Sequence, residues 1–350
     1  MTKRFPHIGV AIALLFAMTA CSSGTSSSSA ASPAPAASGS AEASAQPARG
    51  KIVVGVSAAV LAFAPLYIAQ EKGYWEAENL DVELISFNSG TESQQALLGD
   101  AIDIGAGGYT EPINLTSQGA PTVIFASAQE GLAYKLMTRS DITDLSQVEG
   151  KTLGVSKAGS LSDQVTHIAL NKKGLDPTKV KYQACGGAAS CLAALEAGAV
   201  DGTILSSPTD ELAIKAGFNP LIDVAKELPG FAYEVLYAKR AAIEAKHDLF
   251  LRFMTGYIKA TQYVTDPANK DEVLKITSQA MNRKVADLEI TYDEHIADFP
   301  RTGVPGLEGI QKALDGTKQF GDVSGADKLA ASDLHYPDLQ QEAAASLGVK

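Results

Sequence analysis

Cysteine and histidine are scarce in this sequence. Its 350 residues include three cysteines and five histidines, and these are not spaced like the ligands of a structural zinc site. Basic residues are also few, because 29 lysines and arginines face 40 acidic residues and leave a net charge of −11. A protein that binds phosphate backbones needs a basic surface, so this balance excludes nucleic acid as a partner. We expect no metal and no cofactor.

Long apolar runs are absent except near the N-terminus. The apolar stretch Ile8–Ala20 follows Lys3 and Arg4 and is too short to span a bilayer as a mature helix, which is typical of a signal peptide. It ends in Met18-Thr-Ala-Cys21, and small residues before a lone cysteine are typical of a lipoprotein cleavage site. We predict that residues 1–20 are removed and that Cys21 carries a lipid anchor. The alternative is an ordinary secretory peptide with an incidental cysteine.

Large side chains are missing from residues 21–50, which are nearly all Ser, Ala, Pro and Gly. Such a segment cannot bury enough apolar surface to offset its chain entropy, so it predicts a disordered tether. The remaining body is long enough for two compact lobes. Cys185 and Cys191 belong to this exported body, where they form either a disulfide or two small buried thiols.

The body alternates β-branched runs with amphipathic stretches, which predicts an α/β fold with helices on both faces of a sheet. Strands of a first set are expected at Lys51–Ser57, Asp81–Phe87, Ile102–Ala106 and Pro121–Ser127. A second set is expected at Lys151–Ser156, Val180–Ala184 and Asp201–Leu205, and Tyr233–Ala238 should return to the first lobe. From Ala241 onward the pattern predicts helices.

The loops at the strand ends should hold the functional residues, because ligands of open α/β sheets bind beyond the carboxyl ends of strands. Helix N-termini there offer free N–H groups, and glycines allow close approach of a ligand. The expected binding residues are Ser57, Phe63, Gly90, Thr91, Gly108, Tyr109, Thr110, Lys157, Gly159, Ser160, Ser207 and Pro208. Phe63 and Tyr109 are expected as apolar walls. Ser160 and Ser207 are also placed to cap helices, and Pro208 suits a first helical position.

Signals of nucleotide binding and catalysis are missing. The segment Gly154–Ser160 has the spacing of a P-loop but carries serine where the lysine should be. No GxSxG elbow occurs. His167 and His295 lie in helix-like stretches without an obvious nucleophile, so we assign them structural roles and expect no enzyme.

Three segments resemble a known family. They are residues 64–80 (APLYIAQEKGYWEAENL), residues 94–108 with QQALLGD and IDIG, and residues 193–201 (AALEAGAVD). These segments are similar to helices and a strand of binding proteins for nitrate, sulfonates, taurine and thiamine-pyrimidine precursors, and the resemblance extends over residues 51–260.

The resemblance implies the type II periplasmic-binding-protein fold, in which two α/β lobes are joined by two crossover segments. We place the crossovers near residues 128–138 and 228–238. The lobes are then formed by residues 51–130, 131–230 and 231–350, of which the last completes lobe one with C-terminal helices. Glu130 and Tyr233, in the crossovers, are implied as further ligand-binding residues.

The same resemblance implies a monomeric, lipid-anchored substrate-binding protein of an ABC importer. It would lie at the outer face of the cell membrane or in the periplasm, close on a small-molecule ligand by hinge motion, and dock on permease and ATPase subunits. The alternatives are an enzyme of the same fold, of the pyrimidine-precursor synthase or menaquinone-pathway lyase type, and a surface sensor without transport.

The charge of the ligand is left open by the loops. Sulfonate and nitrate binders bring a basic side chain to the anion, and only Lys157 lies in a cleft loop, with Lys135 and Arg139 near the crossover as substitutes. Glu111 and Glu130 favour an amine or a heterocyclic N–H, although Glu111 could simply be solvated in the first turn of a helix. A sulfonate, a taurine-like zwitterion or a heterocyclic thiamine precursor fits this mixture.

Overall fold

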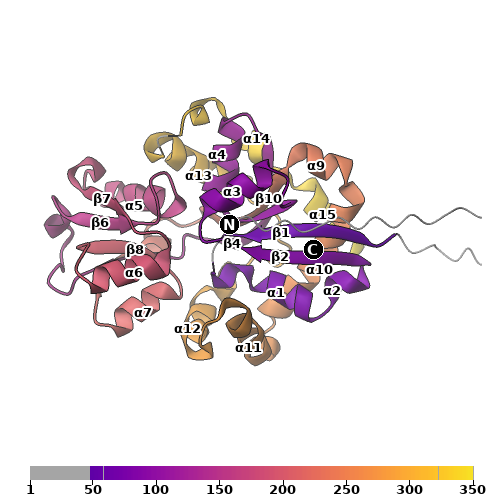
Figure 1. Cartoon of the computed structure of the whole chain (residues 1–350), viewed down its shortest axis with the longest axis horizontal. Helices are drawn as coiled ribbons and strands as arrows, with labels where there is room; N and C mark the ends of the chain where they lie inside the picture. The colour runs from indigo at the N-terminus through magenta and orange to yellow at the C-terminus, as the bar shows by residue number, and fades with distance from the viewer. Residues whose placement is uncertain (1–47, 58, 322, 350) are drawn as a thin grey trace, which may run out of the picture. The chain divides into compact units, whose positions relative to one another are not determined.

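The computed structural model describes residues 48–57, 59–321 and 323–349, which belong to one compact unit (Figure 1). The predicted signal peptide, Cys21 and the tether up to residue 47 lie outside the described residues. Within the described part, no helix combines the length and the apolar composition that a membrane crossing needs.

Five strands form the first sheet, in the order β2-β1-β3-β10-β4. They are β1 (Gly50–Val56), β2 (Leu80–Ser86), β3 (Ile104–Gly108), β4 (Thr122–Glu130) and β10 (Ala232–Lys239). β1 pairs in parallel with β2 and β3, whereas β10 is antiparallel to β3 and β4. Parallel neighbours end at the same edge of a sheet, so the loops after β1, β2 and β3 emerge together.

Helices cover both faces of this sheet, on opposite sides in Figure 1. Ile52, Val54 and Val56 of β1 pack into one core with α1 (Ala64–Glu71), α10 (His247–Thr265) and α15 (Asp338–Ser346). The opposite face packs against α3 (Gly90–Leu98), α4 (Thr110–Ser117) and α13 (Leu307–Phe320). This two-sided burial follows from the near-continuous apolar run of β1.

Five further strands form the second sheet, in the order β7-β6-β8-β5-β9. They are β5 (Tyr134–Thr138), β6 (Thr152–Val155), β7 (Lys181–Ala184), β8 (Gly202–Ser206) and β9 (Asn219–Asp223). α5 (Leu161–Lys172) and α8 (Val224–Glu227) contribute to the core on one face. α6 (Ala188–Glu196) and α7 (Thr209–Lys215) cover Met137 and Leu205 on the other.

The chain passes between the sheets twice, from β4 to β5 through residues 131–133 and from α8 to β10 through residues 228–231. Two α/β lobes joined by two crossovers confirm the predicted fold class. The remaining helices are α2 (Tyr74–Ala77), α9 (Arg240–Ala245), α11 (Lys270–Met281), α12 (Val285–His295) and α14 (Ala331–Leu334). Short 3-10 turns lie at Leu61–Phe63, Leu145–Val148, Pro177–Lys179, Pro267–Asn269, Ile296–Asp298 and Ala326–Lys328.

Most predicted strands occur in the structure, with differences at their ends and at two predicted helix caps, whereas β5 was not predicted. Ser160 caps α5 as predicted, because its side chain accepts the N–H of Asp163. The predicted cap at Ser207 is wrong, since its Oγ is buried without a hydrogen-bond partner. Pro208 precedes α7 at the N-cap and does not occupy the first helical position. β3 begins and ends two residues later than predicted, so Gly107 and Gly108 belong to the strand.

Candidate functional site

A polar cleft of about 710 Å³ lies between the two sheets. Its walls come from the ends of β1, β3, β6 and β8 and from the first turns of α3, α4, α5 and α6. A cleft of this volume suits a small organic molecule. The predicted binding residues that line it are Ser57, Gly90, Thr91, Gly108, Thr110, Lys157, Gly159 and Ser160.

The two predicted apolar walls lie elsewhere. Phe63 is fully buried in the core beside α1, because the loop after β1 forms a 3-10 turn that directs its ring inward. Tyr109 is also fully buried, because β3 continues to Gly108 and the tyrosine side chain turns into the second core. The apolar lining is supplied instead by Val60, Phe87, Tyr134, Leu161 and Ile204.

Four further predicted residues do not line the cleft. Tyr233 is buried, and its ring packs edge-on against that of Tyr134 with 5.6 Å between the centroids. Ser207 is buried, and Pro208 follows it outside the lining. Glu130 is exposed at the end of β4, and partial desolvation of its carboxyl, followed by the charge of Asp298, raises its pKa. Tyr233 and Glu130 therefore have no direct route to a ligand in this cleft.

Glu111 lines the cleft although it was not among the predicted binding residues, and its carboxyl is buried, not solvated. Its Oε1 accepts hydrogen bonds from Ser57 Oγ at 2.9 Å and from the Gly108 N–H at 3.2 Å. Its Oε2 accepts a short hydrogen bond from the Tyr237 hydroxyl. Burial raises the pKa of Glu111, and these three donors oppose that rise.

Missing side chains at two glycines create the space that Glu111 occupies. A Cβ at Gly90 would lie 2.5 Å from Glu111 Oε1. A Cβ at Gly107 would collide with the same oxygen and with Ser57 Oγ. Both positions therefore need glycine for close packing and not for an unusual backbone angle. The sequence signal for the buried acid was this pair of glycines, one at the start of α3 and one near the end of β3.

Glu234 is the second buried acid in the cleft. It lies on β10 opposite Gly108 of β3 and Gln129 of β4. The pairing of β10 with β4 shifts on both sides of Glu234, and such a bulge re-aims a side chain relative to regular alternation. Burial, followed by the charge of Glu111, raises the pKa of Glu234 to about 8. A regular strand pattern gave no indication of this residue.

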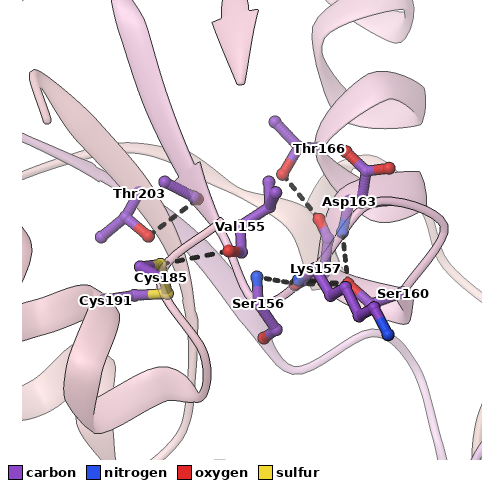
Figure 2. Close-up of a disulfide and its surroundings, with 11 residues drawn as sticks. Val155, Ser156, Lys157, Ser160, Asp163, Thr166, Cys185, Cys191 and Thr203 are labelled. Carbon is purple, nitrogen blue, oxygen red and sulfur yellow. Dashed lines mark hydrogen bonds between the residues drawn. A yellow bond between two sulfur atoms is a disulfide. The ribbon is translucent and has the colours of Figure 1, made fainter. Parts of the chain in front are cut away.

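The second lobe contributes a loop between β6 and α5, shown in Figure 2. Gly159 N–H donates to Asp163 Oδ2 at 2.8 Å, and Ser156 N–H donates to Ser162 Oγ at 2.9 Å. Lys157 is exposed and has no salt bridge in the described part of the chain, so its ammonium group is free to meet a ligand. Side-chain hydrogen bonds thus fix the loop while its lysine stays available.

A disulfide joins Cys185, at the end of β7, to Cys191 in α6 (Figure 2). The segment between them contains Gly186 and Gly187, which line the cleft. Gly186 N–H donates to Ser156 O at 3.0 Å, so the bridged loop abuts the loop that carries Lys157. Of the two states that the sequence left open for these cysteines, the structure contains the disulfide.

Lys135 and Arg139 do not face the cleft. Lys135 Nζ contacts Asp210 at 2.7 Å and Glu211 at 3.0 Å, beside a smaller cavity of about 290 Å³. Burial alone would lower the pKa of Lys135, but its two acidic partners raise it. Arg139 pairs with Asp141 and Asp201. Both cations are already neutralised by acidic partners. Neither is therefore available to bind an anionic ligand, which the sequence analysis had allowed.

The two helical histidines have structural partners. His167 stacks on Tyr182 with 4.3 Å between ring centroids and lies 3.4 Å from Asp163. His295 Nδ1 contacts Asp298 at 3.1 Å in the smaller cavity. Within the described residues, no group of three or more histidine, cysteine or acidic side chains is arranged to hold a metal.

Comparison with known proteins identifies relatives. "Putative binding protein YtlA" of Bacillus subtilis is 28% identical over 215 residues, which cover 60% of this chain and 64% of that protein. The chain therefore matches less than two thirds of the length of this relative.

Solved structures share the fold. The nitrate-binding protein NrtA from Synechocystis PCC 6803 has a TM-score of 0.75 at 17% identity, over 86% of this chain and 89% of that one. The alkanesulfonate-binding protein SsuA from Xanthomonas axonopodis pv. citri, bound to MOPS, has a TM-score of 0.69 at 17% identity, over 84% and 99%. These likenesses confirm the predicted periplasmic-binding-protein fold.

The sequence itself carries the family assignment. The model of the family described as NMT1/THI5 like matches residues 61–270, which is more than half of the chain. This match confirms the resemblance predicted from the three sequence segments. The chain belongs to the NMT1/THI5 like family.

Proposed function

We propose that this protein is the lipid-anchored substrate-binding component of an ABC importer, which captures a small polar organic molecule between its lobes. The observation that carries the proposal is the cleft itself, which is lined from both sheets at their strand ends. Two short crossovers connect the sheets, and such connections allow two lobes to close on a ligand by hinge motion. The relatives that are named as binding proteins support the same role.

A ligand with both polar and apolar surface fits this lining better than nitrate. Phe87, Tyr134 and Leu161 offer apolar contact. Lys157 and Arg283 supply two positive charges, whereas Glu111 and Glu234 supply two acids. A taurine-like zwitterion or a heterocyclic thiamine precursor would use both kinds of group.

Binding is tested by thermal denaturation of the full-length protein with taurine, alkanesulfonates, nitrate, aromatic acids and thiamine precursors. A ligand that binds only the folded form raises the melting temperature. The ligand should be recovered chemically unchanged after incubation, and turnover would favour an enzyme. Loss of uptake of that ligand on deletion of the gene should separate transport from sensing, since a sensor would leave uptake intact.

The anchor is tested at Cys21. We predict that Cys21→Ala releases the protein from the membrane fraction or blocks its maturation, because the thiol is the attachment point for the lipid. Fractionation followed by immunoblotting measures this, with Cys185→Ala as a cysteine control that should stay attached. Unchanged membrane attachment of Cys21→Ala would contradict the anchor and leave the binding function standing.

A further inference from the structure

Two buried carboxyls converge on one backbone position in the cleft. Glu111 accepts the N–H of Gly108, and Glu234 lies directly opposite Gly108 in the pairing of β10 with β3. Glu111 is 4% exposed and Glu234 is 3% exposed, yet both line the cleft. Burial of two acids side by side is costly unless something compensates their charge.

The two carboxyls differ in how well they are supplied with donors. Both oxygens of Glu111 accept hydrogen bonds from Ser57, Gly108 or Tyr237. Glu234 Oε2, in contrast, is buried and has no hydrogen-bond partner. Buried polar atoms are nearly always paired in native proteins, so this oxygen at the wall of the cleft lacks a partner, which for the ionised carboxylate is a donor.

No positive charge in the surrounding elements supplies that donor. After burial, the charge of Glu111 on α4 raises the pKa of Glu234, and a hydrogen bond from the neutral Tyr233 hydroxyl on β10 lowers it. Glu234 in turn acts on Tyr134 of β5 and on Tyr237 of β10. The cleft-lining cations Lys157 and Arg283 contribute to neither acid. The environment of Glu234 is therefore acidic and aromatic.

We propose that Glu234, supported by Glu111, binds a cationic N–H group of the ligand, as found in an amine, an amidine or a protonated nitrogen heterocycle. The inference rests on the proposed binding function and specifies its ligand class. The ligand N–H donates to Glu234 Oε2, and its positive charge offsets both acids. Phe87, Tyr134 and Leu161 then contact the carbon skeleton of the ligand.

Binding of this cation is coupled to release of a proton. Burial and the charge of Glu111 raise the pKa of Glu234 to about 8, so at pH 7 its carboxyl is mostly protonated. The incoming cation favours the carboxylate, and the carboxyl proton passes to the solvent. Apparent affinity for a permanently cationic ligand should therefore rise about tenfold between pH 7 and pH 9, as the ionised fraction of Glu234 rises.

The ligand class is tested with matched probes on the full-length protein at pH 8. Benzamidine is the cation, benzamide the neutral isostere and benzoate the anion. We expect benzamidine to raise the melting temperature more than the other two. Glu234→Gln should abolish this difference, whereas Glu83→Gln, an exposed acid on β2, should leave it intact. No shift with benzamidine, or an equal shift in Glu234→Gln, overturns the ligand class.

Calorimetry tests the proton coupling and separates the two proposals. Titration of benzamidine at pH 7 in buffers of different ionisation enthalpy should show release of about one proton per ligand bound, and at pH 9 close to none. Binding without proton release overturns the role of Glu234. A melting shift with benzoate alone overturns the cationic class but keeps the binding function. Failure of the binding function itself appears separately, as the absence of a melting shift with every compound of the ligand screen and with all three probes.

Discussion

At the scale of single residues, the cleft depends on side chains that are absent. Glu111 reaches its three donors only because Gly90 and Gly107 leave its carboxyl space beside β3. The two glycines lie in different elements, and Glu111 lies in a third. A buried carboxylate of this kind is stable only when all its hydrogen bonds form together.

Gly107→Ala is expected to destabilise the protein by about 1–3 kcal/mol, because the new Cβ collides with Glu111 Oε1 and Ser57 Oγ inside a packed site. Gly99→Ala is the matched control, since its Cβ would meet its nearest atom, Gln95 O, at 3.4 Å. Its effect should stay within about 0.5 kcal/mol. Urea denaturation measures both changes, and equal midpoints for the two variants would contradict the packing argument.

The sequence predicted residues whose roles are local and missed those whose roles depend on packing. Ser160 caps its own helix, so its role follows from three residues of sequence. For Glu111 the sequence leaves open a ligand-facing acid or a solvated helix-start acid, because nothing in α4 indicates the space left by Gly90 and Gly107. Glu234 becomes part of the cleft through a shift in strand pairing, which side-chain alternation does not predict.

At the scale of elements, the positions of most strands along the sequence followed from apolar runs more reliably than the strand ends did. β3 is rich in glycine, so its last residues looked like a loop, and Tyr109 was assigned to the cleft when it lies in the core. β5 was not predicted, because Tyr134–Thr138 follows β4 after only three residues and lies within the crossover expected near residues 128–138. Burial of aromatic residues at strand ends is decided by neighbouring elements.

The disulfide fixes the end of β7 to α6, and its removal should cost about 2 kcal/mol, since it closes a loop of only a few residues. The wild-type protein should lose this stability in dithiothreitol. The double variant Cys185→Ala/Cys191→Ala should be insensitive to the reductant, which makes it the internal control. If the wild type has the same urea midpoint with and without reductant, the disulfide does not contribute to the stability of the folded protein.

At the scale of the whole molecule, the two lobes contribute different kinds of group to the cleft. The first lobe supplies both buried acids, while the second supplies the free ammonium of Lys157 and the disulfide-braced glycine loop. The lobe pattern was readable from two successive series of strands and helices. The uneven distribution of charge could not be predicted from the sequence, because it arises where β10 returns from the second lobe to pair with β3.

The pH dependence of folding should report the buried acid directly. The pKa of Glu234 rises from the ordinary 4.5 to about 8 in the folded protein. Between these values the unfolded chain has released the proton and the folded protein still holds it. The stability that the protonated acid contributes is therefore full below about pH 4.5 and is lost as the pH rises to about 8, by at most about 1.4 kcal/mol per pH unit.

Glu234→Gln removes this titration, so we expect the variant to gain stability relative to the wild type as the pH rises from 5 to 8 and to keep a constant advantage above that. Glu111, whose pKa is also raised, remains in both proteins, and because its charge acts on Glu234 the difference reports the coupled pair relative to Glu111 alone. Urea denaturation at pH 5, 6.5, 8 and 9 measures the difference, with Glu83→Gln expected to run parallel to the wild type. If the free energy of unfolding of Glu234→Gln also runs parallel to that of the wild type across this pH range, the folded protein does not hold a proton on Glu234. The carboxyl would then be ionised in the absence of ligand, and its negative charge would have to be compensated by groups of the protein itself.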